Sequence, residues 1–195
     1  MHGPSALLAA VALLVAAAAV FVSGCSPFMI AAGAAHVALV ATDRRSTGAQ
    51  VDDETIEFKV STTVGSRWGG DVHVNVTSYN GNVLLTGEAP TAEIRSEIVQ
   101  LAKATDRVRN VFDEMVVGPV TDLGARTNDT YITSKVKARL LEAESVKSIY
   151  IKVVTERSVV YLMGIVSREQ GEAAAQVAAT TEGVARVIKL FEYSG

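Results

Sequence analysis

The chain has 195 residues, a length that allows either one domain or two small ones. Its 18 basic and 21 acidic residues give a net charge of -3, which is too balanced for a general nucleic-acid binder. A single cysteine excludes an internal disulfide and a cysteine-built metal cluster, and the three histidines are far apart in sequence. Because of these counts we expect neither a metal site nor a cofactor. Since 49% of the residues are hydrophobic, we expect a folded protein.

The N-terminal segment has the pattern of a secretion signal. An alanine-rich run of 17 apolar residues, 6–22, carries no charge and is followed by small residues. A transmembrane helix needs about 20 apolar residues, so this shorter run favours a signal peptide over residues 1–24. The motif Val22-Ser23-Gly24-Cys25 resembles a bacterial lipobox, in which the cysteine becomes the lipid-modified first residue. An uncleaved anchor or an ordinary signal peptide is the alternative.

If Cys25 is acylated, with palmitate among its chains, residues 25–50 form a lipidated tether. Several acyl chains, at about 0.8 kcal/mol per buried methylene, would hold the protein stably in a membrane. Ser26 follows the cysteine, rather than the aspartate that tends to retain lipoproteins in the inner membrane. This favours the periplasmic face of the outer membrane. The apolar segment 27–41 is either a second membrane-contacting stretch or a tether with little fixed structure.

The rest of the chain contains an internal repeat of two copies, with a period of 76 to 77 residues. Gly87 aligns with Gly164, and Lys59 aligns with Lys135. A repeat of this length is typical of a duplicated structural unit. It predicts two domains, 51–119 and 127–195, joined by a linker over 120–126.

Each copy begins with a predicted helix. Apolar residues recur at i, i+4 and i+8 and mark one buried stripe in each helix: Ile56, Val60 and Val64 in the first copy, and Ile132, Val136 and Leu140 in the second. Side chains that can cap free backbone amides precede both stripes. The expected N-caps are therefore Asp52 or Asp53 in the first copy and Asn128 or Asp129 in the second.

A hairpin, a second helix and a third strand follow in each copy. Asn80-Gly81 fits the tight turn of a hairpin, but the second copy has Ser158 in place of Gly81, so its hairpin should turn differently. The second helix should open at Thr91 in one copy and at Ser167 in the other. Third strands are predicted at 108–116 and 184–193. The fold class is α/β, with two tandem domains that each pack a three-stranded mixed sheet against two helices.

This layout, with its two aligned glycines, resembles BON domains, which are small modules of bacterial envelope proteins. The segments 43–53 (DRRSTGAQVDD) and 128–141 (NDTYITSKVKARLL), together with the lipobox, are similar to those of outer-membrane lipoproteins that carry two BON domains. The resemblance covers nearly all of the mature chain. It implies a protein that binds phospholipid, supports envelope integrity and concentrates at the division site.

The two copies differ in charge. Residues 51–119 contain 6 basic and 11 acidic side chains, whereas residues 127–195 contain 9 basic and 8 acidic ones. The net charges are therefore -5 and +1, so only the second domain can favour an anionic surface.

The first helix of the second domain carries the predicted lipid-binding face. With its apolar stripe turned inward, the residues expected to contact anionic phospholipid are Tyr131, Ser134, Lys135, Lys137, Ala138 and Arg139. Tyrosine is enriched at membrane interfaces, and each cation near anionic headgroups contributes about 1 kcal/mol. Composition alone favours an ordinary solvated helix face, whereas the family resemblance implies lipid contact.

The corresponding face of the first copy is acidic. It presents Glu54, Thr55 and Glu57 with one lysine, Lys59, and an anionic membrane would repel it. We expect this face to be free for a protein partner or simply solvated. The alternative function is therefore a docking scaffold for an outer-membrane assembly or cell-wall protein through the first domain.

No enzymatic activity is predicted, because the sequence indicates no nucleophile paired with a base. The acids from Asp52 to Glu54 are typical of a helix start rather than of a catalytic pair. His73 is expected to be a surface or hydrogen-bonded histidine. Trp68 either covers the first core or marks a docking loop.

Overall fold

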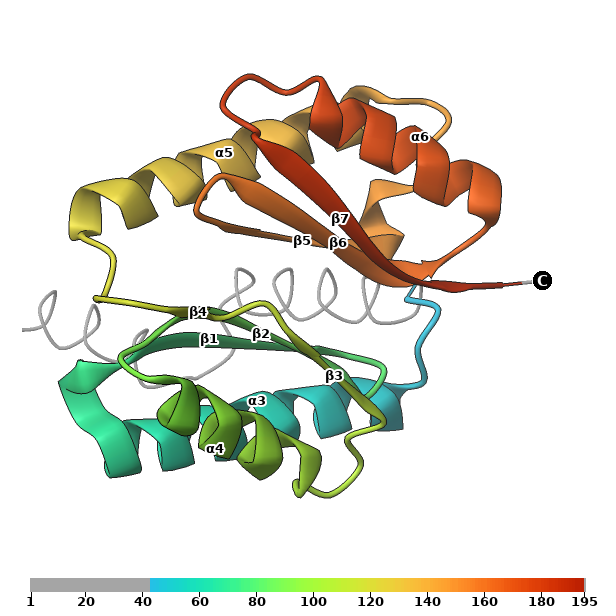
Figure 1. Ribbon diagram of the computed structural model, residues 1–195. Helices are drawn as coiled ribbons and strands as arrows, with labels where there is room; N and C mark the ends of the chain where they lie inside the picture. The colour runs from blue at the N-terminus through green and yellow to red at the C-terminus, as the bar shows by residue number, and fades with distance from the viewer. Residues whose placement is uncertain (1–42, 195) are drawn as a thin grey trace, which may run out of the picture. The chain divides into compact units, whose positions relative to one another are not determined.

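The computed structural model describes residues 43–194, and Asp43–Gly195 forms one compact unit. The predicted signal peptide, the acylated Cys25 and the tether up to residue 42 lie outside the described residues. Figure 1 shows two successive α/β domains in the described part. None of the helices in this part is long and apolar enough to cross a bilayer.

The first domain contains two long helices and a mixed sheet. Its elements are α3 (Thr47–Trp68), η1 (Gly69–Asp71), β1 (His73–Tyr79), β2 (Asn82–Ala89), α4 (Ala92–Lys103), β3 (Asn110–Asp113) and β4 (Val116–Val117). The central strand β2 is antiparallel to β1 and parallel to both β3 and β4. The third strand, predicted as continuous, is interrupted because Met115 turns into the core.

The second domain repeats this topology. Its elements are α5 (Leu123–Glu142), η2 (Ser148–Tyr150), β5 (Ile151–Glu156), β6 (Val159–Val166), α6 (Arg168–Ala179) and β7 (Arg186–Tyr193). The central strand β6 is antiparallel to β5 and parallel to β7. The predicted fold class of two α/β units, each with a mixed sheet and two helices, is confirmed.

The two predicted helical stripes are buried in two separate cores. Ile56, Val60 and Val64 of α3 pack against β2 and α4, and the equivalent stripe of α5 packs against β5, β6 and α6. Thr91 caps α4, and Ser167 caps α6 in a capping box with Gln170, as predicted. The spacing of apolar residues therefore identified the inward face of each long helix.

The repeated glycine has a steric cause. Gly87 pairs with Val74 across the sheet with φ at 110°, and a Cβ there would overlap the carbonyl oxygen of His73. A Cβ at Gly164 would similarly overlap the carbonyl oxygen of Tyr150. Only glycine allows this close approach of neighbouring strands, which explains why it recurs at equivalent positions of the two copies.

The predicted N-caps of the two long helices are wrong. Helix α3 begins earlier, with Ser46 as its N-cap, and α5 begins earlier with Asp122. Asp53 and Asp129 instead lie inside the helices and are buried. The carboxylate of Asp53 accepts hydrogen bonds from the backbone N–H of Asn80 at 2.7 Å and of Gly81 at 2.8 Å. Each helix thus holds the hairpin turn of its own domain through a buried acid.

The expectation of a different second hairpin is also wrong. Arg157 and Ser158 both have positive φ, at 52° and 60°, as do Asn80 and Gly81 at 53° and 74°. Both turns therefore share the left-handed conformation of a tight hairpin. The N–H groups of Arg157 and Ser158 each donate to Asp129 at 2.8 Å. These bonds stabilise a conformation that ordinary side chains disfavour.

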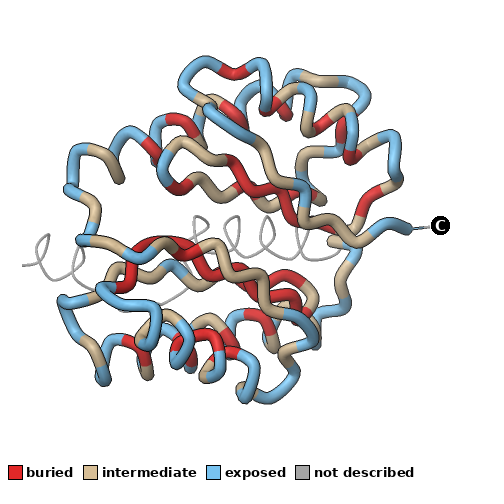
Figure 2. Tube along the Cα trace, in the orientation of Figure 1, coloured by how far each residue is buried: buried red, intermediate tan, exposed pale blue. Residues whose placement is uncertain are grey.

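The two sheets pack face to face, with the helices on the outside (Figure 1). The strand faces turned away from the helices form a third apolar cluster, which contains Tyr79 and Leu84 from the first domain and Tyr161 and Met163 from the second. Figure 2 shows the resulting band of buried residues along the facing strands. The central strand β2 is buried along its whole length, because both of its faces are covered.

Polar contacts border this apolar layer. Lys152 Nζ lies 2.7 Å from Glu57 Oε1, and Arg109 of the first domain lies 3.1 Å from Glu192 of the second. The segment before α3 contacts both domains: Arg44 donates to the carbonyl of Ile165 at 2.8 Å, and Arg45 pairs with Asp53 at 2.8 Å. The contacts that join the domains are therefore both apolar and ionic.

Candidate functional sites

The predicted lipid-binding residues lie together on α5. This helix covers the outer side of the second sheet, on the side away from the first domain (Figure 1). Tyr131 is 61% exposed, and Ser134, Lys137, Ala138 and Arg139 are also exposed, while Lys135 is half-buried. The sister domain therefore does not cover this face.

The three cations of this face differ in how they are held. Lys135 Nζ lies 3.5 Å from Glu182 and 4.7 Å from the centre of the Tyr131 ring. Arg139 donates to the carbonyl of Val177 at 3.2 Å and to the hydroxyl of Thr181 at 2.9 Å, both near the end of α6. Among the described residues, Lys137 has no ion pair and no side-chain hydrogen bond. Lys137 is thus the cation of this face most available to an external anion.

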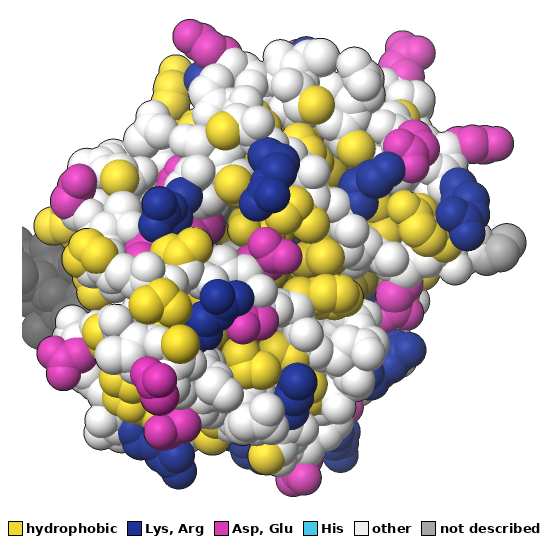
Figure 3. All heavy atoms as spheres, in the orientation of Figure 1, with side chains coloured by type: hydrophobic (Ala, Val, Ile, Leu, Met, Phe, Trp, Pro, Cys, Tyr) yellow, Lys and Arg dark blue, Asp and Glu magenta, His cyan; other side chains and the backbone are white. Residues whose placement is uncertain are grey.

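A shallow hollow with an apolar floor lies beside Lys137. Its volume is about 260 Å³, and its other lining residues include Leu140, Leu141, Ile149 and Ile151. Leu141 is 71% exposed. Figure 3 shows that hydrophobic and basic side chains adjoin one another at several places on the visible face of the molecule. This hollow lengthens the predicted face toward the C-terminal end of α5, which the sequence did not indicate.

The equivalent helix of the first domain presents a different surface. Glu57, expected to be free for a partner or simply solvated, instead binds Lys152 and accepts a hydrogen bond from the Ser78 N–H at 2.7 Å. Phe58 is 72% exposed on this helix, and Lys59 is exposed beside it. Trp68 packs against the first core, which supports the covering role over the docking loop.

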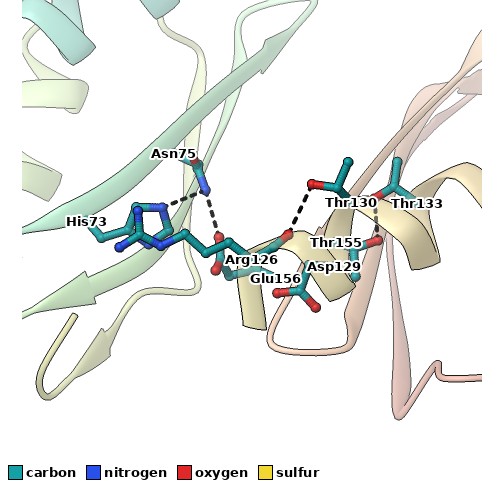
Figure 4. Close-up of a pocket in the computed structure, with 8 residues that line it drawn as sticks. All are labelled: His73, Asn75, Arg126, Asp129, Thr130, Thr133, Thr155 and Glu156. Carbon is teal, nitrogen blue, oxygen red and sulfur yellow. Dashed lines mark hydrogen bonds between the residues drawn. The ribbon is translucent and has the colours of Figure 1, made fainter. Parts of the chain in front are cut away.

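A polar pocket of about 230 Å³ lies between the two domains (Figure 4). Asn75 of β1 extends toward the second domain, where its Nδ2 donates to Glu156 Oε2 at 2.8 Å. His73 of β1 lies beside it, with Nδ1 3.0 Å from Glu88 Oε2. Arg126 and Asp129 line the pocket from α5. His73 is therefore a hydrogen-bonded histidine, as predicted, but its carboxylate neighbours were not foreseen.

The pKa values of Glu88 and Glu156 are shifted in opposite directions. Burial raises the pKa of Glu88, but hydrogen bonds from Thr121 and the nearby His73 outweigh burial and hold the pKa below its usual value. Burial raises the pKa of Glu156, and the hydrogen bond from Asn75 offsets only part of this rise. The nearby carboxylates of Glu88 and Asp129 raise the pKa of Glu156 further.

Both halves of the chain match known proteins. The model of the BON domain matches residues 52–119 and 128–195. The chain is 39% identical over 178 residues to a Haemophilus influenzae protein named outer membrane lipoprotein DolP, an alignment that covers 90% of the chain and 92% of that relative. It is 37% identical over 153 residues to the 21 kDa hemolysin of Actinobacillus pleuropneumoniae, covering 77% of the chain and 79% of the relative.

A more distant relative is the osmotically-inducible protein Y of Escherichia coli, which is 29% identical over 152 residues, with 76% of each chain covered. The two matched segments coincide with the two α/β domains of the structure. The chain therefore belongs to the BON-domain family and carries two copies of the module.

Proposed function

We propose that the protein is a non-enzymatic outer-membrane lipoprotein, anchored through Cys25 on the periplasmic face, that binds anionic phospholipids through the outer face of α5. In this proposal it supports envelope integrity at the division site. The relative named outer membrane lipoprotein DolP, aligned over 90% of the chain, supports the anchored location. The observation that carries the lipid-binding role is the exposed face of α5, where the ring of Tyr131 is 61% exposed and Lys137 lines an apolar hollow toward the C-terminal end of the helix.

The physical basis is a weak surface contact added to an anchor. Lys135, Lys137 and Arg139 each contribute about 1 kcal/mol near an anionic surface, so together they supply about 3 kcal/mol. The amphipathic ring of Tyr131 and the exposed side chain of Leu141 suit the boundary between headgroups and acyl chains. A contact of this strength is effective when a lipid anchor already holds the protein at the membrane.

Co-sedimentation with vesicles tests this proposal. The probe is the compact unit 43–195, mixed with phosphatidylglycerol-containing vesicles or with phosphatidylcholine vesicles. Lys135→Glu combined with Lys137→Glu should lower binding to the anionic vesicles at least about 30-fold, because two attractive charges are lost and two repulsive ones are added. Arg139 is left intact, since it also binds the end of α6.

The matched control is Lys59→Glu, which alters the aligned lysine on the first helix of the other domain. It should leave binding to the anionic vesicles nearly unchanged, since Lys59 lies outside the proposed face. Equal loss in both variants, or unchanged binding of the double variant, would reject α5 as the lipid-binding face.

Exposed apolar residues on α3 support a second candidate function, protein docking through the first domain. Phe58 and Val51 are exposed at a spacing of seven residues, so they lie on one side of α3, with Glu54 between them. This domain has a net charge of -5, which suits a basic partner. A photo-crosslinker in place of Phe58 should yield one defined protein adduct in cells, whereas a crosslinker in place of Ala138 should label lipid. No protein adduct at position 58 would reject the docking function.

A further inference from the structure

Three possible metal ligands meet at the border between the domains. They are His73 of β1, Glu88 of β2 and Glu156 of β5, and one ligand atom of each lies within 4.8 Å of the other two. Glu88 is completely buried and Glu156 is 4% exposed. The three residues come from three different strands, two in the first domain and one in the second.

We propose that His73, Glu88 and Glu156 bind one divalent transition-metal ion, with Zn²⁺ as the preferred ion. Imidazole and carboxylate groups are both normal ligands of Zn²⁺, at bond lengths of about 2.0 to 2.2 Å. In a tetrahedral site such bonds separate neighbouring ligand atoms by about 3.3 Å. His73 Nδ1 and Glu88 Oε2 are already 3.0 Å apart, and the ion would replace the hydrogen bond between them, with the proton of the neutral imidazole carried on Nε2.

The surrounding hydrogen bonds resemble those that orient metal ligands. Glu156 Oε2 accepts from Asn75 at 2.8 Å and from Thr86 at 3.3 Å, while its Oε1 accepts no hydrogen bond from any described residue. Thr121 donates its backbone N–H to Glu88 at 3.1 Å. Donors of this kind fix the direction of carboxylate ligands and leave lone pairs for an ion. The adjacent pocket, lined by His73 and Glu156, offers a path of entry and room for a water as fourth ligand.

The carboxylates of the cluster outnumber the cations beside it, which are Arg157 and Arg126, a residue of the pocket wall that donates to the carbonyl of Thr121 at 2.7 Å. Glu88 and Glu156 lie together in the cluster, and Asp129 lines the same pocket as Glu156, so three carboxylates are close to the proposed ion. Arg157 lies 3.9 Å from Glu88, a loose ion pair formed by a side chain that is about half exposed. This guanidinium can turn into solvent when an ion enters, because it makes no side-chain hydrogen bond with any other described residue.

An ion at this position would join the two domains directly. His73 and Glu88 belong to the first domain, whereas Glu156 belongs to the second, so the metal would add a coordinate link to the contacts between the sheets. Binding to the folded state alone raises stability by mass action. The proposal is independent of lipid binding, since none of the three ligands lies on the outer face of α5.

The experiment uses the full chain purified in detergent, freed of metal with a chelator and titrated with zinc chloride. Bound zinc is measured by calorimetry and elemental analysis, and the melting temperature is followed with and without the ion. Wild-type protein should bind one zinc ion per chain through the proposed site and melt at a higher temperature with zinc. Glu156→Gln and His73→Ala should each weaken this binding at least about tenfold, since even residues that only support metal ligands have effects of that size.

The matched control is Glu192→Gln. Glu192 is another acid between the domains, bound by Asn80, Asn82 and Arg109, but it lies outside the ligand cluster. This variant should keep wild-type zinc affinity even if it loosens the domains. Glu156→Gln preserves side-chain size, so it decides the outcome if His73→Ala fails to fold. Absence of zinc binding, or equal zinc binding in wild type and Glu156→Gln, would overturn the proposal.

Discussion

The two hairpins of the molecule reach one conformation with different residues. In the first domain the turn is Asn80-Gly81, two residues suited to positive φ, and in the second it is Arg157-Ser158, which are not. Both turns donate two backbone N–H groups to a buried aspartate on the preceding long helix, Asp53 in one domain and Asp129 in the other. A buried acid on the long helix therefore supports the turn even in the second domain, where the turn residues disfavour positive φ.

The two aspartates nevertheless differ in the number of groups they bind. Besides the turn, Asp53 accepts from the Ser78 hydroxyl at 2.6 Å and pairs with Arg45 at 2.8 Å. Asp129 has only its two turn contacts among the described residues, and no described arginine pairs with it. The first acid is therefore part of a larger buried network, and its loss should be the more costly.

Removal of the two acids should have the largest effect on this comparison. Asp53→Ala should reduce the free energy of unfolding by about 3–5 kcal/mol, because the N–H groups of Asn80 and Gly81 and the Ser78 hydroxyl lose their acceptor and Arg45 loses one of its two carboxylate partners. Asp129→Ala should cost about 2–3 kcal/mol, since two amide groups are left unsatisfied. Urea unfolding followed by circular dichroism measures both values. A larger loss of stability in Asp129→Ala would contradict the inference that Asp53 makes the larger contribution.

Exchange of the turn residues should have a smaller effect. Gly81→Ser should cost about 2–3 kcal/mol, because serine disfavours positive φ and its Cβ would lie 2.8 Å from the Arg107 carbonyl oxygen. Ser158→Gly should instead stabilise the protein by about 0.5–1 kcal/mol, by relieving the same backbone strain. Thermal unfolding of both variants gives the signs. If Ser158→Gly were destabilising, the serine side chain would itself stabilise the folded protein, by more than the strain of its positive φ.

The smallest effect concerns Asp43, which binds Arg45, the arginine that pairs with Asp53. Arg45 binds Asp43 at 2.7 Å, and although burial raises the pKa of Asp43, the hydrogen bonds and charge of Arg45 outweigh it and lower the pKa. A lowered pKa in the folded state stabilises the protein above the ordinary value of 3.8, and this contribution disappears as the pH falls through the folded-state pKa.

Asp43→Asn should therefore cost at most about 1 kcal/mol at neutral pH, since solvent screens part of the interaction. The difference from wild type should vanish in acid, where Asp43 of the wild type is protonated. Unfolding by urea at several pH values measures this trend. A difference that persists in acid would mean that Asp43 acts through packing rather than charge.

Local elements were predictable because their signals are local. The stripe of Ile132, Val136 and Leu140 identified the inward face of α5, and Ser167 with Gln170 identified the start of α6. The starts of the long helices were missed because their first turns lie before the apolar stripes, so a pattern of buried residues cannot locate them. An acid near a helix start predicts a cap, whereas Asp53 and Asp129 each bind a turn that is distant in sequence.

The packing of the domains required information that separate elements do not contain. Consecutive apolar residues such as Val83, Leu84 and Leu85 in β2, and a similar run in β6, are the signal of strands buried on both faces. That signal was available but does not say which surface covers the second face. His73, Glu88 and Glu156 could not have been grouped, because the distance between them depends on how the sheets meet. The outer face of α5 was easier to identify, since it follows from helix geometry alone.

The strand order of each sheet has a consequence for biosynthesis. In both domains the central strand pairs first with its hairpin neighbour, and its other edge is completed only by a strand that follows a helix. As the chain is made from its N-terminus, the earlier domain finishes while the later one is still missing. Its inner apolar surface, which includes Leu84, therefore remains exposed to solvent until the sheet of the second domain has formed. For that interval the unfinished protein exposes an apolar sheet face that is prone to aggregation, so rapid completion of the second half protects it.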